Sequence, residues 1–330
     1  MKRIVCLILA MLFCLATPYG VADEEPIRIG MLIYNGTDAF MTDVFSRMLS
    51  MADDSVQVSF LDSKNSQVLQ NDQVEQLLKG GVDALIVNLV DRTTAVYLIR
   101  LVMPYGVPLV FINREPLMED LVLYDKAYYV GNNPKHSGQL CGELLVDYFA
   151  ENPDADRNGD GVIQYVMLKG EPGHQDTELR TIYAVKALQE AGFALEKLAE
   201  DTAMWERSIA QDKMSSYLSS YGEQIECVIA NNDEMALGAI EALKAAGYFS
   251  RGKFLPVVGV DATDHARAAL AEGTLLGTVL NDPQGLSEAA YQLALLLAQG
   301  EPATTEALGY PIDQGIYVWT DSRKVTAGSQ

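Results

Sequence analysis

In this chain a polar loop, Asp156-Arg-Asn-Gly-Asp-Gly-Val-Ile-Gln164, runs directly into an apolar segment, Tyr165-Val-Met-Leu168. Oxygen-bearing side chains stand at the first, third, fifth and ninth places of the loop, and a glycine stands sixth. This is the ligand order of an EF-hand calcium loop, in which the seventh residue, here Val162, adds its backbone carbonyl. The pattern therefore predicts a Ca²⁺ site made by Asp156, Asn158, Asp160, Val162 and Gln164.

Two features of this loop depart from a true EF-hand. The twelfth place, where a bidentate Glu belongs, is Met167. The segment that follows is strand-like and not helical. The missing carboxylate must then come from elsewhere in the chain. The alternative is an acidic turn that holds no metal.

Outward from the loop, short apolar segments alternate with amphipathic ones almost throughout the chain. Strands are expected at 27–34, 56–62, 84–90, 108–113, 127–131, 163–169, 226–230, 256–260 and 277–280. Helices are expected at 38–51, 66–79, 93–103, 175–191, 208–221, 233–246 and 284–297. Such alternation predicts an α/β fold with parallel sheets covered on both faces. We interpret it as two doubly wound parallel-sheet domains in sequence.

The first residues have the form of a cleavable export signal. Lys2 and Arg3 precede an apolar run at 4–16, and small residues end at Ala22, so we expect cleavage after residue 22. An uncleaved anchor is the alternative, and Phe13 before Cys14 argues against a lipid-modified terminus. The formal charge of −21 becomes −21 − 2 = −23 without the leader, which argues against a nucleic-acid partner.

Cleavage would leave two of the four cysteines. Cys141 and Cys227 are expected on a helix and a strand in different halves of the chain. Buried free thiols are the preferred interpretation, and a disulfide stays open.

A set of polar and aromatic residues follows the carboxyl ends of the expected strands. Ligands of parallel sheets bind at that edge, so two facing edges predict a cleft between the domains. Its candidate lining residues are Asp38, Phe40, Asn113, His174, Asp176, Arg180, Trp205, Asn232, Asp261 and Asn281. Carboxylates and amides suit an uncharged ligand dense with hydroxyls, and the two aromatic rings offer flat apolar faces.

Each of these residues also has an ordinary structural interpretation. Asp38 and Asn232 stand at expected helix starts and could be N-caps. Phe40 and Trp205 could be core residues. His174 could be a satisfied loop residue.

Several longer motifs carry a resemblance to a known family. They include Asp38-Ala-Phe-Met41, Phe111-Ile-Asn-Arg-Glu-Pro116, Leu168-Lys-Gly-Glu-Pro-Gly-His174, Asp201-Thr-Ala-Met-Trp205, Ala230-Asn-Asn-Asp233 and Gly277-Thr-Val-Leu-Asn-Asp282. With these, the chain resembles the periplasmic D-galactose/D-glucose-binding proteins, the substrate-binding components of sugar ABC transporters. The resemblance spans about 28–300. The loop at 35–38 departs from the usual pattern, and the tail at 310–330 matches poorly.

The resemblance implies roles for the candidate residues. All ten would contact a hexose, with Phe40 and Trp205 on its two faces and Asp38 at the hydroxyl that separates galactose from glucose. Glu226 would supply the missing carboxylate of a structural Ca²⁺ site. Three crossovers, near Asn132, Pro283 and Gln314, would join a first lobe (23–132 plus 283–314) to a second (133–282 plus 315–330). The implied partners are a monosaccharide, an ABC permease and a chemoreceptor. The resemblance also implies that this protein is a monomer in the periplasm.

Three rival functions stay open at this point. A glycoside hydrolase could use two of the Asp residues as acid and base, but the sequence holds no nucleophile elbow, zinc motif or phosphate loop. A sugar-responsive transcription regulator needs a helix-turn-helix where this chain has a leader. A binding protein for another sugar or sugar-like signal is the closest competitor, and no enzymatic activity is expected.

Overall fold

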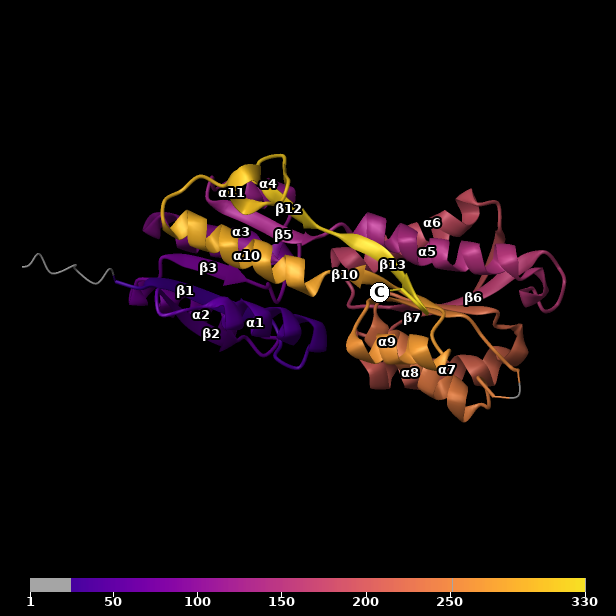
Figure 1. Cartoon of the computed structure of the whole chain (residues 1–330). Coiled ribbons are helices and arrows are strands. Elements are labelled where there is room, and N and C mark those ends of the chain that lie inside the picture. The colour runs from indigo at the N-terminus through magenta and orange to yellow at the C-terminus, as the bar shows by residue number, and fades with distance from the viewer. Residues whose placement is uncertain (1–24, 251, 330) are drawn as a thin grey trace, which may run out of the picture.

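Two separate sheets form the frame of the molecule (Figure 1). In this computed structural model, residues 25–250 and 252–329 are described, so the expected leader at 1–22 lies outside them. The first sheet has the order β11-β12-β5-β4-β3-β1-β2, and the second has the order β13-β10-β9-β8-β6-β7. Both are parallel except for the edge strands β11 and β13, which confirms the predicted α/β class.

The strands of the first sheet come from both ends of the chain. They are β1 (Ile27–Ile33), β2 (Val56–Asp62), β3 (Ala84–Val87), β4 (Leu109–Ile112), β5 (Ala127–Asn132), β11 (Ile312–Asp313) and β12 (Tyr317–Thr320). The strands of the second sheet are β6 (Val162–Lys169), β7 (Ala194–Thr202), β8 (Cys227–Ala230), β9 (Val257–Asp261), β10 (Gly277–Asn281) and β13 (Ser322–Thr326).

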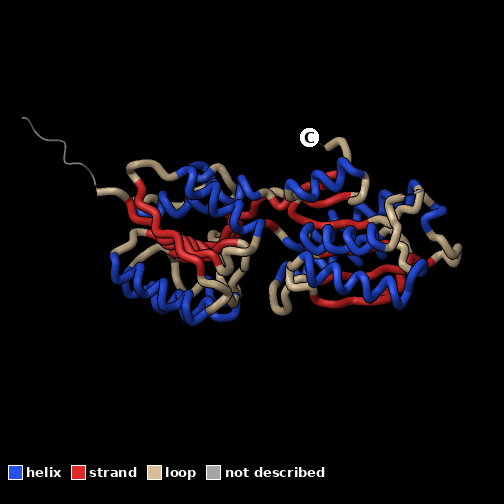
Figure 2. The backbone as a smooth tube through the Cα atoms, turned by 90° about the horizontal axis from the view of Figure 1, so that it is seen from below, coloured by secondary structure: helices blue, strands red, loops and turns tan. Residues whose placement is uncertain are grey.

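Helices cover both faces of each sheet (Figure 2). Those of the first lobe are α1 (Ala39–Met51), α2 (Gln67–Gly80), α3 (Ala95–Val102), α4 (Met118–Leu121), α10 (Pro283–Ala298) and α11 (Thr305–Leu308). Those of the second lobe are α5 (Pro134–Glu151), α6 (Gln175–Glu190), α7 (Arg207–Tyr221), α8 (Asp233–Ala245) and α9 (Asp264–Glu272). Short 3₁₀ turns lie at η1 (Arg92–Thr94), η2 (Met103–Tyr105), η3 (Pro153–Ala155) and η4 (Gly222–Gln224).

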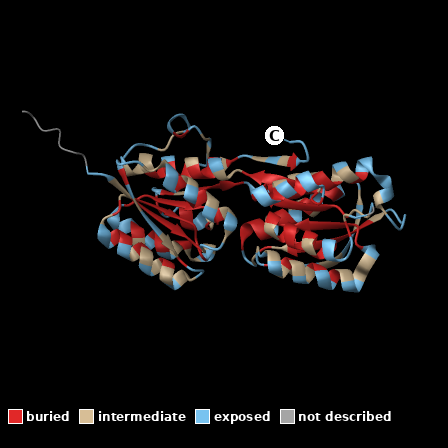
Figure 3. Ribbon diagram, turned by 60° about the horizontal axis from the view of Figure 1, so that its bottom comes forward, coloured by how far each residue is buried: buried red, intermediate tan, exposed pale blue. Residues whose placement is uncertain are grey.

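Each sheet therefore has a core on each face. In the first lobe, one cluster joins the sheet to α1 and α10, and another joins it to α2 and α3. In the second lobe, α7, α8 and α9 pack on one face, and α5 and α6 pack on the other. The central strands are the most deeply buried elements, and the outer helix faces are exposed (Figure 3). Burial on both faces explains why the central strands read as continuous apolar runs.

The path between the two sheets crosses three times. The chain leaves the first sheet after β5, returns between β10 and α10, and leaves it again between β12 and β13. We expected the third crossing near Gln314, with 315–330 in the second lobe. That boundary is wrong, because β12 pairs with β5 and buries Tyr317 and Val318 in the first lobe. The crossing lies at Asp321.

Several elements were absent from the sequence expectation, most of them at edges or lobe surfaces. They are α4, α9, α11, β7, β11, β12 and β13, while α5 was expected only as a helix around Cys141, without bounds. Strand β7 is an edge strand with four charged residues, so its apolar pattern is too weak to predict a strand from the sequence.

Both cysteines lie in the second lobe, Cys141 on a helix and Cys227 on a strand as expected. Within the described residues, Cys141 on α5 and Cys227 on β8 are buried and form no disulfide. Burial raises the pKa of each thiol, to about 12 for Cys141, which keeps both protonated. Among the helices described at 25–250 and 252–329, none is long and apolar enough to cross a membrane.

Candidate functional site

A cleft with a volume of about 350 Å³ lies between the lobes. It is lined from the first lobe by residues that follow β1 and β4, and from the second by residues that follow β6, β7, β8, β9 and β10. These are the carboxyl ends of parallel strands. The strand order reverses between β1 and β3 and between β6 and β8, so the cleft sits beside the switch point of each sheet.

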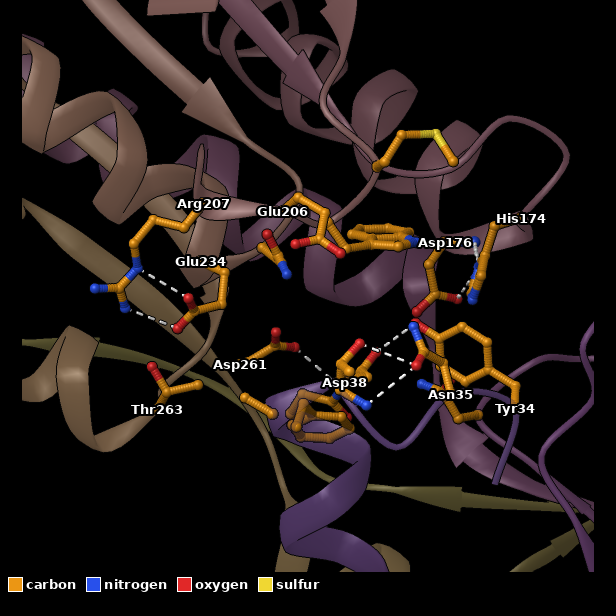
Figure 4. Close-up of a pocket in the computed structure, with 18 of the residues that line it drawn as sticks. Tyr34, Asn35, Asp38, His174, Asp176, Glu206, Arg207, Glu234, Asp261 and Thr263 are labelled. Carbon is orange, nitrogen blue, oxygen red and sulfur yellow. Dashed lines mark hydrogen bonds and ion pairs between the residues drawn. The ribbon is translucent and has the colours of Figure 1, made fainter. Parts of the chain in front are cut away.

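All ten residues singled out from the sequence line this one cleft. Asp38, Phe40 and Asn113 belong to the first lobe, and the other seven belong to the second: His174, Asp176, Arg180, Trp205, Asn232, Asp261 and Asn281. Figure 4 shows Asp261 on one side of Asp38 and Asp176 on the other, with His174 next to Asp176. The structure thus brings together side chains that are up to 243 positions apart in the sequence (281 − 38).

The two aromatic residues come from opposite lobes. Phe40 packs partly against the core of the first lobe, and Trp205 packs partly against the core of the second. Neither ring is fully buried, so each keeps a face for the cleft. The glycine at position 170 allows this placement, because a Cβ there would overlap the indole of Trp205.

Three cleft residues serve as helix caps as well. Asp38 accepts from the backbone N–H of Met41 at 2.8 Å, and Asn232 accepts from that of Met235 at 3.0 Å. The imidazole Nδ1 of His174 accepts from the N–H of Asp176 at 3.1 Å. The capping interpretation is therefore correct for Asp38 and Asn232, and it fixes these side chains at the cleft instead of removing them from it.

Arg180 organises the charges on the floor of the cleft. Its guanidinium lies 2.7 Å from the carboxylate of Asp176 and 3.7 Å from that of Asp261, and all three side chains are at most 7% exposed. Burial raises the pKa of Asp176 and of Asp261 above the usual range, although the positive charge of Arg180 opposes this.

Burial acts on His174 in the opposite sense. It lowers the pKa of the imidazole, and the guanidinium groups of Arg114 and Arg180 lower it further. The ring is therefore neutral at neutral pH. Because Nδ1 accepts from Asp176, the proton is assigned to Nε2, which makes His174 a hydrogen-bond donor.

Some polar atoms of the cleft lack a protein partner within the described part of the chain. They are Asp176 Oδ1, Arg180 Nε and Asn281 Oδ1, all buried. Buried polar atoms are normally hydrogen-bonded, so these are suited to a ligand that both donates and accepts.

The backbone is strained at three of the same residues. Asn113, Trp205 and Asp261 have φ values of 61°, 66° and 122°, in the left-handed region that non-glycine residues rarely adopt. Such outliers gather where the surrounding structure holds a functional side chain in one direction. Three of the ten candidate residues have this backbone conformation, which supports a binding role for the cleft.

Other residues line the cleft that the sequence did not predict there. Tyr34 and Arg114 line it beside Asp38, and the bidentate pair of Arg207 with Glu234 lies at its edge, both distances being 2.9 Å (Figure 4). Tyr34 directly follows β1 and Arg114 directly follows Asn113, so their position at strand ends was the available signal.

The expected calcium loop lies at the far end of the second lobe from this cleft, before β6. Glu226 reaches it from the segment before β8, and its two carboxylate oxygens accept from the N–H groups of Arg157 (2.6 Å) and Gln164 (3.1 Å). Burial raises the pKa of Glu226, and the charges of Asp156 and Asp160 raise it further.

The loop itself is held by its own acidic side chains. The carboxylate of Asp156 accepts from the N–H groups of Gly159 and Gly161, and that of Asp160 accepts from the N–H of Val162. Gly161 has φ 78°, as the sharp turn requires. Across the described residues, no group of three or more His, Cys, Asp or Glu side chains is arranged as a metal centre. An oxygen-only donor set with two amides fits a hard cation such as Ca²⁺, which would also relieve the mutual repulsion of the three carboxylates.

Comparisons with known proteins agree with this geometry. Residues 29–302 match the family described as "Periplasmic binding protein domain". The D-galactose/methyl-galactoside binding periplasmic protein of Haemophilus influenzae is 44% identical over 84% of this chain and 83% of its own. A putative rhizopine-binding protein of Rhizobium meliloti is 34% identical over 83% and 82%.

A solved structure gives the same result. An ABC transporter solute binding protein from Bacillus halodurans, with bound myo-inositol, superimposes with a TM-score of 0.78 at 30% identity. The match covers 93% of this chain and 96% of that one.

Proposed function

The chain belongs to the family of periplasmic binding proteins, and on that premise we propose that it binds one monosaccharide, D-galactose or D-glucose, between its lobes. The observation that carries the proposal is the convergence of ten side chains, predicted as a hexose site, on a single interlobe cleft. The 44% identity to a D-galactose/methyl-galactoside binding protein supports the choice of hexose.

The chemistry of the cleft fits an uncharged polyol. The rings of Phe40 and Trp205 would cover the two C–H faces of a pyranose, each from its own lobe. Asp38, Asp176 and Asp261 would accept from hydroxyl groups, and the neutral His174 would donate through Nε2. Because contacts come from both lobes, they are satisfied together only when the lobes close around the sugar, which stabilises the closed state.

Titration calorimetry with a panel of sugars tests this proposal. We expect saturable binding of one molecule of D-galactose or D-glucose, and much weaker binding of D-ribose and D-xylose. Binding of neither hexose would overturn the proposal.

A second candidate ligand class is a different sugar or a cyclic polyol. The myo-inositol in the Bacillus halodurans structure and the relative named as a rhizopine-binding protein favour including it. Myo-inositol therefore belongs in the same panel. Tight binding of myo-inositol without binding of either hexose would select this alternative.

We expect the protein to bind the sugar without catalysing its hydrolysis. The buried carboxyls Asp176 and Asp261 are both fixed on Arg180, and this supports a binding role for them rather than an acid–base pair. Incubation with aryl galactosides and glucosides should release no phenol. Release that depends on Asp176 or Asp261 would contradict this part of the proposal.

Partners and location follow from the same premise. Export through the leader at 1–22 would deliver a monomer to the periplasm, where the closed form would dock on an ABC permease and a chemoreceptor. The loop Asp156–Gln164 with Glu226 would hold a structural Ca²⁺ ion outside the cleft, stabilising the second lobe.

A further inference from the structure

The side chain of Tyr34 fixes the carboxylate of Asp38 on one side of the cleft. Its hydroxyl donates to Asp38 Oδ2 at 2.7 Å, and the N–H of Met41 donates to Oδ1 at 2.8 Å. A carboxylate accepts about four hydrogen bonds, so roughly two acceptor positions are left, one on each oxygen. Burial and the charge of Asp38 raise the pKa of Tyr34, which keeps its proton available for donation.

The guanidinium of Arg114 covers the ring of Tyr34. Its Cζ lies 3.8 Å from the ring centroid, and its side chain is only 4% exposed. Nη1 donates to the backbone oxygen of Val90 at 2.7 Å. A planar guanidinium can stack on a ring and direct its N–H groups sideways at the same time, which a lysine cannot do.

The same guanidinium also reaches the other lobe. Arg114 Nη2 lies 2.6 Å from the carboxylate of Glu171, which follows β6. Asn113, the residue before Arg114, makes a second link between the lobes, because its backbone oxygen accepts from Gln175 Nε2 at 3.0 Å. The dipeptide Asn113-Arg114 is thus tied to residues on both sides of His174. Arg114 and His174 form the wall between the cleft and a neighbouring hollow.

We propose that Tyr34 and Arg114 are positioning residues that link the orientation of the Asp38 carboxylate to closure of the lobes through the Arg114–Glu171 ion pair. The inference rests on the proposed hexose binding and on the role that the resemblance implies for Asp38, which would accept from the hydroxyl that distinguishes galactose from glucose. Axial and equatorial hydroxyls approach a carboxylate from different directions. A carboxylate held by two donors offers fixed lone pairs, so its orientation sets the ratio of the two affinities.

The first test removes one hydroxyl. In Tyr34→Phe, Asp38 loses one of its two fixed donors and can rotate, so the galactose-to-glucose affinity ratio should change by about three- to tenfold. The matched control is Tyr124→Phe, which deletes a buried hydroxyl of the same lobe that donates to Val107 O, and it should keep the wild-type ratio. Loss of protein stability alone would weaken the binding of both sugars equally and leave the galactose-to-glucose affinity ratio unchanged.

The outcomes distinguish failure of the proposed hexose binding from failure of the positioning role of Tyr34 and Arg114. Wild-type protein that binds neither epimer contradicts the proposed function. Wild-type binding with an unchanged ratio in Tyr34→Phe overturns the inference and leaves the function standing. Should Tyr34→Phe fail to fold, Arg114→Lys keeps the charge opposite Glu171 and loses the stacking, and the same change of ratio is expected.

The second test measures the link to the other lobe. Glu171→Gln removes the ion pair, and its effect on hexose affinity should be non-additive with that of Tyr34→Phe by at least about threefold. Asp147→Asn, which breaks an exposed pair with Lys324 in the same lobe, should combine additively with Tyr34→Phe. Additive behaviour of Glu171→Gln would overturn the link between Asp38 and lobe closure.

Discussion

The imidazole of His174 meets the indole of Trp205 edge to face, with ring centroids 5.3 Å apart and ring planes at 74°. This geometry is favourable for aromatic pairs. Both residues follow strands of the second lobe, and they are 31 positions apart in the sequence (205 − 174 = 31). The contact restrains the orientation of the indole, which lines the same cleft as Phe40.

The first prediction concerns this face. Trp205→Ala should weaken hexose binding by about 2–4 kcal/mol, the range of aromatic anchors, which is roughly 30- to 1000-fold in affinity. Trp205→Phe keeps an aromatic ring and should lose less. Calorimetry measures both variants, and thermal unfolding without sugar checks that the fold is kept. Wild-type affinity in Trp205→Ala would remove the stacking role.

The second prediction tests the support behind the indole. A methyl group at position 170 would overlap the indole ring, so Gly170→Ala should displace Trp205 and weaken sugar binding by at least tenfold. Gly80→Ala is the matched control, since a Cβ at position 80 would meet no other atom within 4 Å. Gly300→Ala would not serve, because the backbone there has a φ of 77°, which an alanine rarely adopts. Near-ultraviolet circular dichroism reports the tryptophan environment. An unchanged spectrum with intact binding in Gly170→Ala would contradict the prediction.

Sequence and structure agree where the signal is local. The apolar runs at β1 and β6 and the polar residues that follow them predicted both the sheets and their ligand edges. The choice between cap and cleft residue for Asp38 and Asn232 could not be resolved, because one side chain does both. Capping is a local pattern, whereas the direction in which the helix start faces depends on the sheet.

Other features are set by contacts between distant segments. No sequence pattern marks the left-handed backbone of Asn113 or Trp205, since neither is a glycine. Strand β12 was missed because its four residues gain their stability by pairing with β5, about 190 positions earlier in the chain (317 − 129 = 188). The stacking of Arg114 on Tyr34 joins segments that are 80 positions apart (114 − 34).

The third prediction concerns calcium. If the loop binds Ca²⁺ at a free concentration near 100 times its dissociation constant, the ion stabilises the fold by about 2.7 kcal/mol. Removal by a chelator should then lower the melting temperature by roughly 5–10 °C. Sugar binding should persist, because the loop is outside the cleft.

Two variants make this test specific. Glu226→Gln should abolish most of the calcium-dependent shift, since it removes the buried carboxylate. Glu223→Gln, an exposed neighbour that pairs with Lys253, should retain the shift. A melting curve that is the same with and without chelator would eliminate the calcium proposal.

The fourth prediction concerns the pH dependence of stability and rests on Asp233. This carboxyl is fully buried at the start of α8 and accepts from Thr278 Oγ1 at 2.6 Å and from the N–H of Thr263 at 2.8 Å. Burial raises the pKa of Asp233 to about 7, although the hydrogen bonds from the two threonines oppose this. The nearby carboxyl of Asp261 titrates together with it, because each charge disfavours the other.

The sign follows from comparing the folded and unfolded states. An unfolded Asp has a pKa of about 3.9, so the folded protein binds this proton more tightly than the unfolded chain does. The stabilisation from Asp233 is therefore fully present below about pH 4 and is lost as the pH rises through about 7. His174, whose pKa is lowered by burial, acts in the opposite direction as the pH falls below about 6.5.

Comparison with Asp233→Asn reports the titration of Asp233 together with its coupling to Asp261, because the amide does not titrate. Without sugar, the stability of the wild type relative to this variant should rise as the pH falls from 8 to 6, with a slope of up to about 1.4 kcal/mol per pH unit. Asp264→Asn, at an exposed position on α9, should show no such slope. Urea unfolding at each pH gives the free energies. If the difference between wild type and Asp233→Asn were constant from pH 8 to 6, the carboxyl of Asp233 would share one pKa in the folded and unfolded states.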